Sequence, residues 1–116
     1  MSVTTPAQPD VTAPTVQVTY PTQGATVSRT IYFRGTAKDL KGSTYEVPSG
    51  IAGVQFLVDG VNAGPVLTVP YSGSTYRLQF DTRTLPNGPH VLAVRASDQA
   101  GNTATSAGIT FTVSNK

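Results

Sequence analysis

Apolar and polar residues alternate along most of this chain, most regularly in one segment near its middle. There Val54, Phe56 and Val58 fall on one face of an extended strand, and the alternation stops at an Asp-Gly dipeptide. A period of two that ends at Asp-Gly is typical of a β-strand entering a tight hairpin. We expect residues 53–60 to be the central strand of a β-sandwich, with their apolar face in the middle of the core.

The same alternation recurs between turns rich in Gly, Pro, Asn and Asp, and no segment shows the 3.6-residue period of an amphipathic helix. The other predicted strands are residues 15–20, 30–38, a short return strand after the turn at 58–61, and residues 66–69, 75–81, 90–97 and 105–113. Pro65 and Pro70 bracket one of them, which indicates an edge strand, where a missing N–H is tolerated. The pattern predicts an all-β fold, a Greek-key sandwich of about seven antiparallel strands in two sheets.

Strand parity also predicts which side chains face the core. Gly35 falls on the buried side of its strand, which suggests close approach by a bulky group of the opposing sheet, for which we select Phe56. We expect Leu85 to close one end of the sandwich. The other inward residues are predicted to be Val16, Val18, Tyr20, Ile31, Phe33, Ala37, Tyr76, Leu78, Phe80, Leu92, Val94, Ala96, Ile109, Phe111 and Val113.

Length and composition limit the architecture and the partners. The 116 residues are enough for one domain. We expect a Pro-rich linker at 1–14, the sandwich at 15–114 and the end of a second linker at 115–116. Only 12% of residues are charged and the net charge is +2 without a basic run, which disfavours nucleic acid and membrane surfaces as partners. Cysteine is absent, so neither disulfides nor thiolate metal sites are expected.

Several short segments together resemble the bacterial immunoglobulin-like (Big-type) domain family. They are 13–16 (APTV), 24–27 (GATV), 52–60 (AGVQFLVDG), 86–90 (PNGPH) and 96–104 (ASDQAGNTA). The resemblance covers about residues 13–113 and implies an immunoglobulin-like sandwich that acts as a non-catalytic extracellular spacer or adhesion module. The chain departs from the family pattern at 40–50, where a longer loop replaces a short turn.

The sequence contains few residues that could form a catalytic site. His90 is the single histidine and Glu46 the single glutamate of the chain, and no nucleophile-elbow sequence is present. We expect His90 to pack against the turn before it, and we do not expect an enzyme.

Four oxygen-bearing residues are candidates for a calcium site: Asp10, Asp39, Asp98 and Asn102. Asp39 and Asp98 follow strands that should end at the same pole of the sandwich, in opposing sheets, and Ca²⁺ binds six to eight oxygens. The alternative is that Asp98 and Asn102 hydrogen-bond the backbone of their own turn and that Asp39 caps the adjacent loop. No other cofactor is expected.

Two further groups are candidates for binding a ligand. Tyr32 points outward, and Tyr45 and Tyr71 lie in loop or edge segments, so the three rings could pack against sugars, although isolated surface tyrosines are common. The 40–50 loop offers Lys41, Tyr45 and Glu46 for contact with a partner, because irregular loops on rigid sandwiches often carry specific function.

These patterns favour one module of a larger secreted or surface protein of a bacterium. The expected partners are neighbouring domains of the same polypeptide. The alternative is an accessory module that binds a polysaccharide or a surface protein through the 40–50 loop or the tyrosines. Residues 1–14 lack the pattern of a signal peptide, so we expect an export signal elsewhere in a longer chain.

Overall fold

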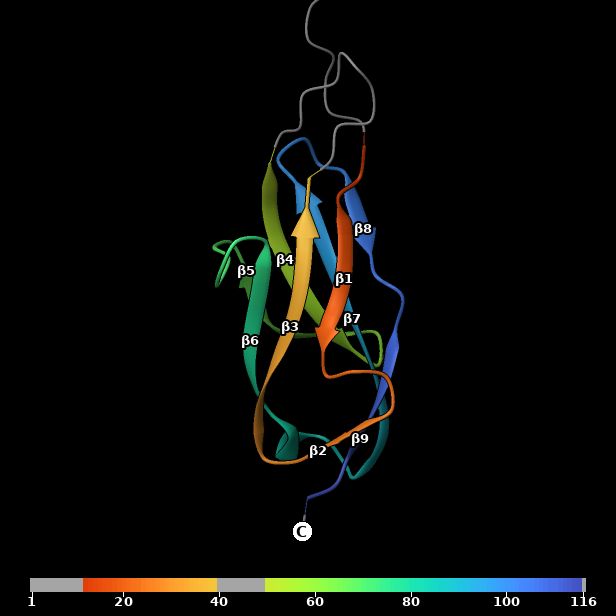
Figure 1. Cartoon of the computed structure of the whole chain (residues 1–116). Helices are drawn as coiled ribbons and strands as arrows, with labels where there is room; N and C mark the ends of the chain where they lie inside the picture. Colours follow the sequence, from red (N-terminus) through yellow and green to blue (C-terminus); the bar gives the residue numbers. More distant parts are fainter. Residues whose placement is uncertain (1–11, 40–49, 116) are drawn as a thin grey trace, which may run out of the picture.

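Two β-sheets packed face to face form the protein, and the computed structural model describes residues 12–39 and 50–115 (Figure 1). The strands and the single 3-10 turn are β1 (Thr15–Tyr20), β2 (Ala25–Val27), β3 (Thr30–Lys38), β4 (Ile51–Val58), β5 (Val61–Leu67), β6 (Thr75–Asp81), η1 (Thr82–Thr84), β7 (Gly88–Asp98), β8 (Thr103–Thr105) and β9 (Ile109–Val113).

One sheet has the strand order β1-β3-β6, and the other has the order β2-β9-β7-β4-β5 with β8 also paired to β7. Neighbouring strands are antiparallel except for β2 and β9, which are parallel. The all-β sandwich predicted from the alternation is confirmed. As predicted for the Pro65 segment, β5 lies at a sheet edge.

Aromatic rings from both sheets fill the core. Phe33 of β3 lies 5.9 Å from Phe56 of β4 and 5.8 Å from Phe111 of β9, measured between ring centroids, and all three are fully buried. The predicted close approach to Gly35 is also confirmed. A Cβ added there would lie 3.5 Å from Phe56 and 3.1 Å from a backbone oxygen, so only glycine fits without a shift.

The central strand β4 lies between β7 and β5 in its sheet, and its residues from Gly53 to Val58 are buried on both faces. Gln55, on the face opposite to the core, is only 6% exposed. The hairpin predicted after β4 is present: Asp59 and Gly60 both have positive φ, at 53° and 80°, which matches a type I′ turn.

The structure corrects four details of the predicted strands. Tyr20 is not inward but 42% exposed, because a bulge between Val18 and Tyr20 reverses its parity. The strand predicted at 66–69 is the end of β5.

The last predicted strand is two, β8 and β9, because the three residues between Thr105 and Ile109 face only two residues between Leu92 and Arg95. Short β2 was not predicted as a strand, since three residues carry too little alternation to detect.

The chain crosses the sandwich from one end to the other. Figure 1 shows β1 beginning at one end and the C-terminus lying at the opposite end. We call them the β1 pole and the C-terminal pole. No helix among the described residues has the length and apolar character needed to span a bilayer.

Candidate functional site

Three exposed tyrosines and two arginines gather on the outer surface of the three-stranded sheet. We call this set, Tyr20, Tyr32, Arg34, Tyr71 and Arg77, the tyrosine–arginine face. The three tyrosines are 38–56% exposed. Tyr32 and Tyr71, the two described tyrosines of the three predicted to bind a ligand, therefore belong to one surface.

Arg77 joins the two predicted tyrosines. Its guanidinium carbon lies 3.6 Å from the ring centroid of Tyr71 and 4.5 Å from that of Tyr32, both within cation–π range. The turn before β6 holds Tyr71 in place, since its N–H donates to the carbonyl of Thr75 at 2.8 Å. The rings thus restrain the Arg77 side chain while the edge of its guanidinium keeps N–H donors available.

The strand register places the two arginines side by side. Arg34 of β3 lies directly opposite Tyr20 of β1 on one side and opposite Arg77 of β6 on the other. Like charges directly opposite each other on neighbouring strands destabilise a sheet. Within residues 12–39 and 50–115, neither arginine forms an ion pair with a carboxylate.

A shallow depression of about 260 Å³ is lined by Tyr20, Ile31, Tyr32 and Arg34, at one part of this face. Its volume is below the roughly 300–1,000 Å³ of pockets that enclose a small molecule. The face is therefore suited to a ligand that lies along the sheet rather than one that is enclosed.

Sequence reasoning missed three members of this face. Tyr20 was assigned inward because a bulge is not visible in the alternation. Arg34 and Arg77 both have outward parity, which the sequence does show, but the pairing of their strands was needed to bring them together.

The β1 pole contains Asp39 and Asp98, as predicted, because β3 and β7 both end there. A carboxylate oxygen of Asp39 accepts a hydrogen bond from the Gly50 N–H, and the Gly50 carbonyl accepts from Gln99, which follows Asp98. Asp98, 2% exposed, accepts from the backbone N–H of Asn102 at 2.8 Å and from its side-chain amide at 2.9 Å. These are the local bonds that the alternative to calcium predicts.

Calcium binding at this pole stays a prediction. Among the described residues, no three Asp, Glu or His side chains are grouped closely enough to hold a metal ion. Asp10, Lys41, Tyr45 and Glu46 lie outside the described residues, as does the 40–49 part of the loop.

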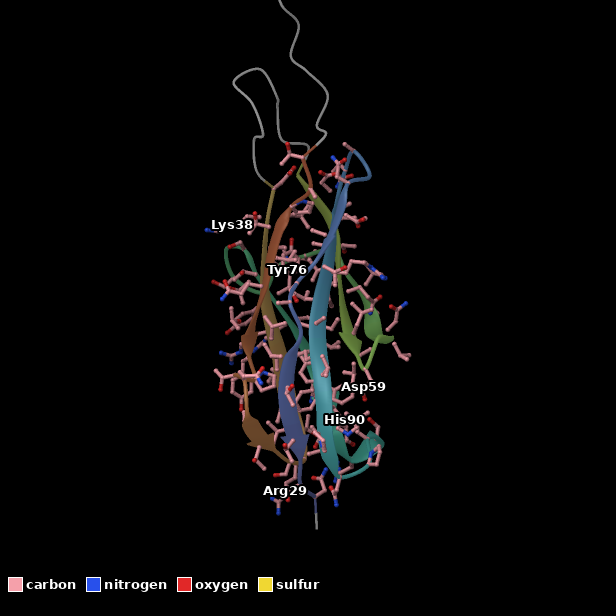
Figure 2. All side chains as sticks on the ribbon, turned by 90° about the vertical axis from the view of Figure 1, so that its right-hand side faces the viewer. Arg29, Lys38, Asp59, Tyr76 and His90 are labelled. Carbon is pink, nitrogen blue, oxygen red and sulfur yellow. The ribbon has the colours of Figure 1, made fainter. Side chains whose placement is uncertain are left out.

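His90 and Asp59 form a pair that the sequence did not reveal. His90 Nδ1 lies 2.7 Å from a carboxylate oxygen of Asp59, and His90 Nε2 lies 2.8 Å from the carbonyl oxygen of Pro86 (Figure 2). Both of these oxygens are acceptors, so the imidazolium form, in which both ring nitrogens donate, satisfies both contacts. The hydrogen bond to Asp59, and then the one to Pro86, raises the pKa of His90, and the same His90 bond lowers the pKa of Asp59.

The C-terminal pole holds Asn115 by hydrogen bonds from its backbone and side chain. Its backbone N–H donates to the side-chain oxygen of Asn87, and its backbone carbonyl accepts from the side-chain N–H of Asn87, each at 2.8 Å. Its side chain accepts from the Arg29 N–H at 2.7 Å and donates to Thr82 Oγ1 at 3.1 Å. These bonds hold Asn115, the last described residue, against the sandwich.

A family model described as "Bacterial Ig domain" matches residues 14–94 of the chain. No curated protein matches the sequence. Several solved structures share the fold at low sequence identity. An endo-beta-1,4-mannanase from Thermotoga petrophila aligns with 92% of this chain and 21% of its own, at a TM-score of 0.65 and 20% identity.

The fibronectin(III)-like modules of Clostridium thermocellum CbhA align with 91% of this chain and 48% of theirs, at a TM-score of 0.61 and 24% identity. An engineered protein aligns with 96% of this chain and 21% of its own, at a TM-score of 0.58 and 19% identity. This chain thus spans less than half the length of each of these proteins.

Proposed function

The chain belongs to the bacterial Ig domain family, and from this we propose that it is a non-catalytic module that holds neighbouring domains apart in a larger secreted or surface protein. The observation that carries the proposal is the position of the two poles. The described chain starts at one end of the sandwich and leaves at the other, so domains attached at the two ends would be separated by its full length (Figure 1).

The anchored Asn115 supports the same role. A spacer fixes the orientation of the next domain only if the chain leaves it in a defined direction. The backbone N–H of Arg29, the side-chain amide of Asn87 and the hydroxyl of Thr82 come from different segments, and all three bond Asn115. A following domain would therefore begin from a fixed point.

The similar structures support a place within a longer chain. The part that aligns with this chain is 21% of the mannanase chain and 48% of the CbhA chain in the solved structures. Modules of this type are common in secreted multidomain proteins of bacteria, and we extend that location to this chain.

The state of His90 supports a role without catalysis. It is the single histidine of the sequence, and both of its ring nitrogens donate to oxygens of the protein. An imidazolium held in this way has no lone pair with which to act as a general base.

A spin-label experiment tests the proposal, and the absence of native cysteine makes labelling specific. One label is placed on Thr15→Cys at the β1 pole and the other on a rigid reporter domain fused after Lys116. We expect a narrow distance distribution. The control carries six Gly/Ser residues between Asn115 and the reporter. A distribution as broad as that of the control would contradict the spacer role.

A second function, ligand binding by the exposed tyrosines, is favoured by their gathering on one face with Arg77 between two of them. This function is compatible with the first, since the face lies along the sheet and away from both poles.

A further inference from the structure

Two arginines of the tyrosine–arginine face place like charges side by side. Arg34 and Arg77 are directly opposite each other in the register, and no described carboxylate pairs with either. Among the outward-facing residues of β1, β3 and β6, Lys38 is a third cation. The one carboxylate among these residues is Asp81, which lies at the end of the sheet and is bonded to Arg83 at 2.9 Å. The uncompensated positive charge favours an anionic ligand.

The chemistry of the arginines narrows the class of anion. A guanidinium presents N–H donors in a plane and binds a carboxylate through two parallel hydrogen bonds. Arg77 is restrained by Tyr32 and Tyr71, so little side-chain freedom is lost when its N–H edge binds.

The neutral and aromatic side chains of the face indicate the chemistry of the uncharged part of the ligand. Gln17, Thr36 and Gln79 supply neutral amide and hydroxyl groups around the arginines. Exposed aromatic rings next to neutral polar groups suit sugars, which have apolar C–H faces and many hydroxyls. The depression between Tyr20 and Tyr32 is shallow, which suits a polymer that lies on the surface of the sheet.

We propose that the tyrosine–arginine face binds an acidic polysaccharide, whose carboxylates pair with Arg34 and Arg77 and whose sugar rings pack on the exposed tyrosines. The inference rests on the proposed ligand-binding role of this face and names its ligand class. The carboxylates neutralise the two arginines, which relieves the repulsion between them in the free protein.

The test measures binding of the full chain to polygalacturonate, to its methyl-esterified form and to a neutral galactan, by affinity electrophoresis and calorimetry. We expect binding to polygalacturonate that weakens with added salt, and at least tenfold weaker binding to the esterified polymer, which has the same sugar backbone without the charge. Arg34→Gln and Arg77→Gln should each weaken binding about tenfold.

The matched control is Arg95→Gln, which removes an arginine from the opposite sheet, where it contacts Asn62. We expect this variant to bind as the native chain does. Arg34→Gln should keep the native melting temperature or exceed it, because it removes one member of the like-charged pair. A loss of binding in that variant would therefore not reflect unfolding.

The possible results distinguish a failure of the acidic-polysaccharide proposal from a failure of the ligand-binding role of the face. Equal binding to the esterified or neutral polymer would overturn the acidic class and keep glycan binding. Equal binding to polyglutamate would replace the polysaccharide by an acidic protein and overturn the inference. No binding to any of these polymers would overturn both the inference and the ligand-binding role.

Discussion

His90 Nδ1 and the Asp59 carboxylate meet at 2.7 Å and connect the β4–β5 turn to the first residues of β7. Asp59 also accepts the backbone N–H of Val91 at 2.9 Å, and Asp59 itself has a positive φ of 53°. The pair therefore holds a turn whose backbone is unfavourable for most residues against the strand beside it.

The charge state of this pair predicts how stability depends on pH. The pKa of His90 is raised, so its contribution is complete below the unfolded value of about 6.5 and is lost as the pH rises through the folded value. The pKa of Asp59 is lowered, so its contribution is present above about pH 4 and is lost as the pH falls through its folded value. We expect the free energy of unfolding to be highest between about pH 4 and 6.5.

Urea unfolding over a pH series measures this dependence. His90→Gln should lower the free energy of unfolding by about 1–2 kcal/mol at pH 6, a discounted value because Asp59 is half exposed. The variant should also remove the decline above pH 6.5, since the sequence has no other histidine. An unchanged decline in the variant would mean that the pair does not form.

Gln55 should be one of the few polar side chains whose loss is costly. Its amide nitrogen donates to the carbonyls of Phe56, Ala63 and Gly64 at 3.0–3.2 Å, where β5 bulges away from β4. Gln55→Ala leaves buried carbonyl oxygens without this donor, and we expect a loss of about 1–3 kcal/mol in chemical unfolding. Gln79→Ala, on an exposed position, is the control and should change stability by less than about 0.5 kcal/mol.

Asn115→Ala should weaken the anchor at the C-terminal pole. The substitution removes the side-chain bonds to Arg29 and Thr82, and we expect a loss of about 1–2 kcal/mol together with faster amide exchange at the Arg29 N–H. Asn62→Ala removes an exposed amide with one long contact of 3.4 Å and serves as the control. Native exchange at Arg29 in the Asn115 variant would contradict the anchoring role.

Calcium should not change the thermal midpoint. Both carboxylate oxygens of Asp98 already accept hydrogen bonds from Asn102, so a cation at the β1 pole would have to displace them. Melting is compared in millimolar calcium and in chelator. A higher midpoint with calcium, by the linkage between binding and folding, would contradict this expectation and support the metal site predicted from Asp10, Asp39, Asp98 and Asn102.

The sequence was sufficient for features that depend on alternation within one strand. The boundaries of β1, β3 and β6 were predicted correctly, as was the approach of Phe56 to Gly35. Features that depend on pairing were not predicted. The bulge that turns Tyr20 outward changes its parity by one residue, and the Arg34–Arg77 pair needs the register of β3 against β6.

Contacts between distant segments escaped the sequence for the same reason. Asp59 was identified as a turn residue and His90 as a residue packed at a corner, and each assignment is locally correct. Their ion pair requires β4 and β7 to be neighbours in one sheet. Asn115 was assigned to a linker, because nothing in its local sequence indicates that Asn87 and Thr82 lie beside it.

The central claim is that the folded sandwich is a single mechanical unit that spans from the β1 pole to the C-terminal pole. Pulling a single molecule by its two ends tests this most directly. Force along β1 and β9 acts parallel to the strands, so the ladders of β1 with β3 and of β9 with β7 are loaded together. We predict that the sandwich resists extension and then unfolds in a single step. Gradual lengthening at low force, with β1 or β9 separating first, would contradict the claim.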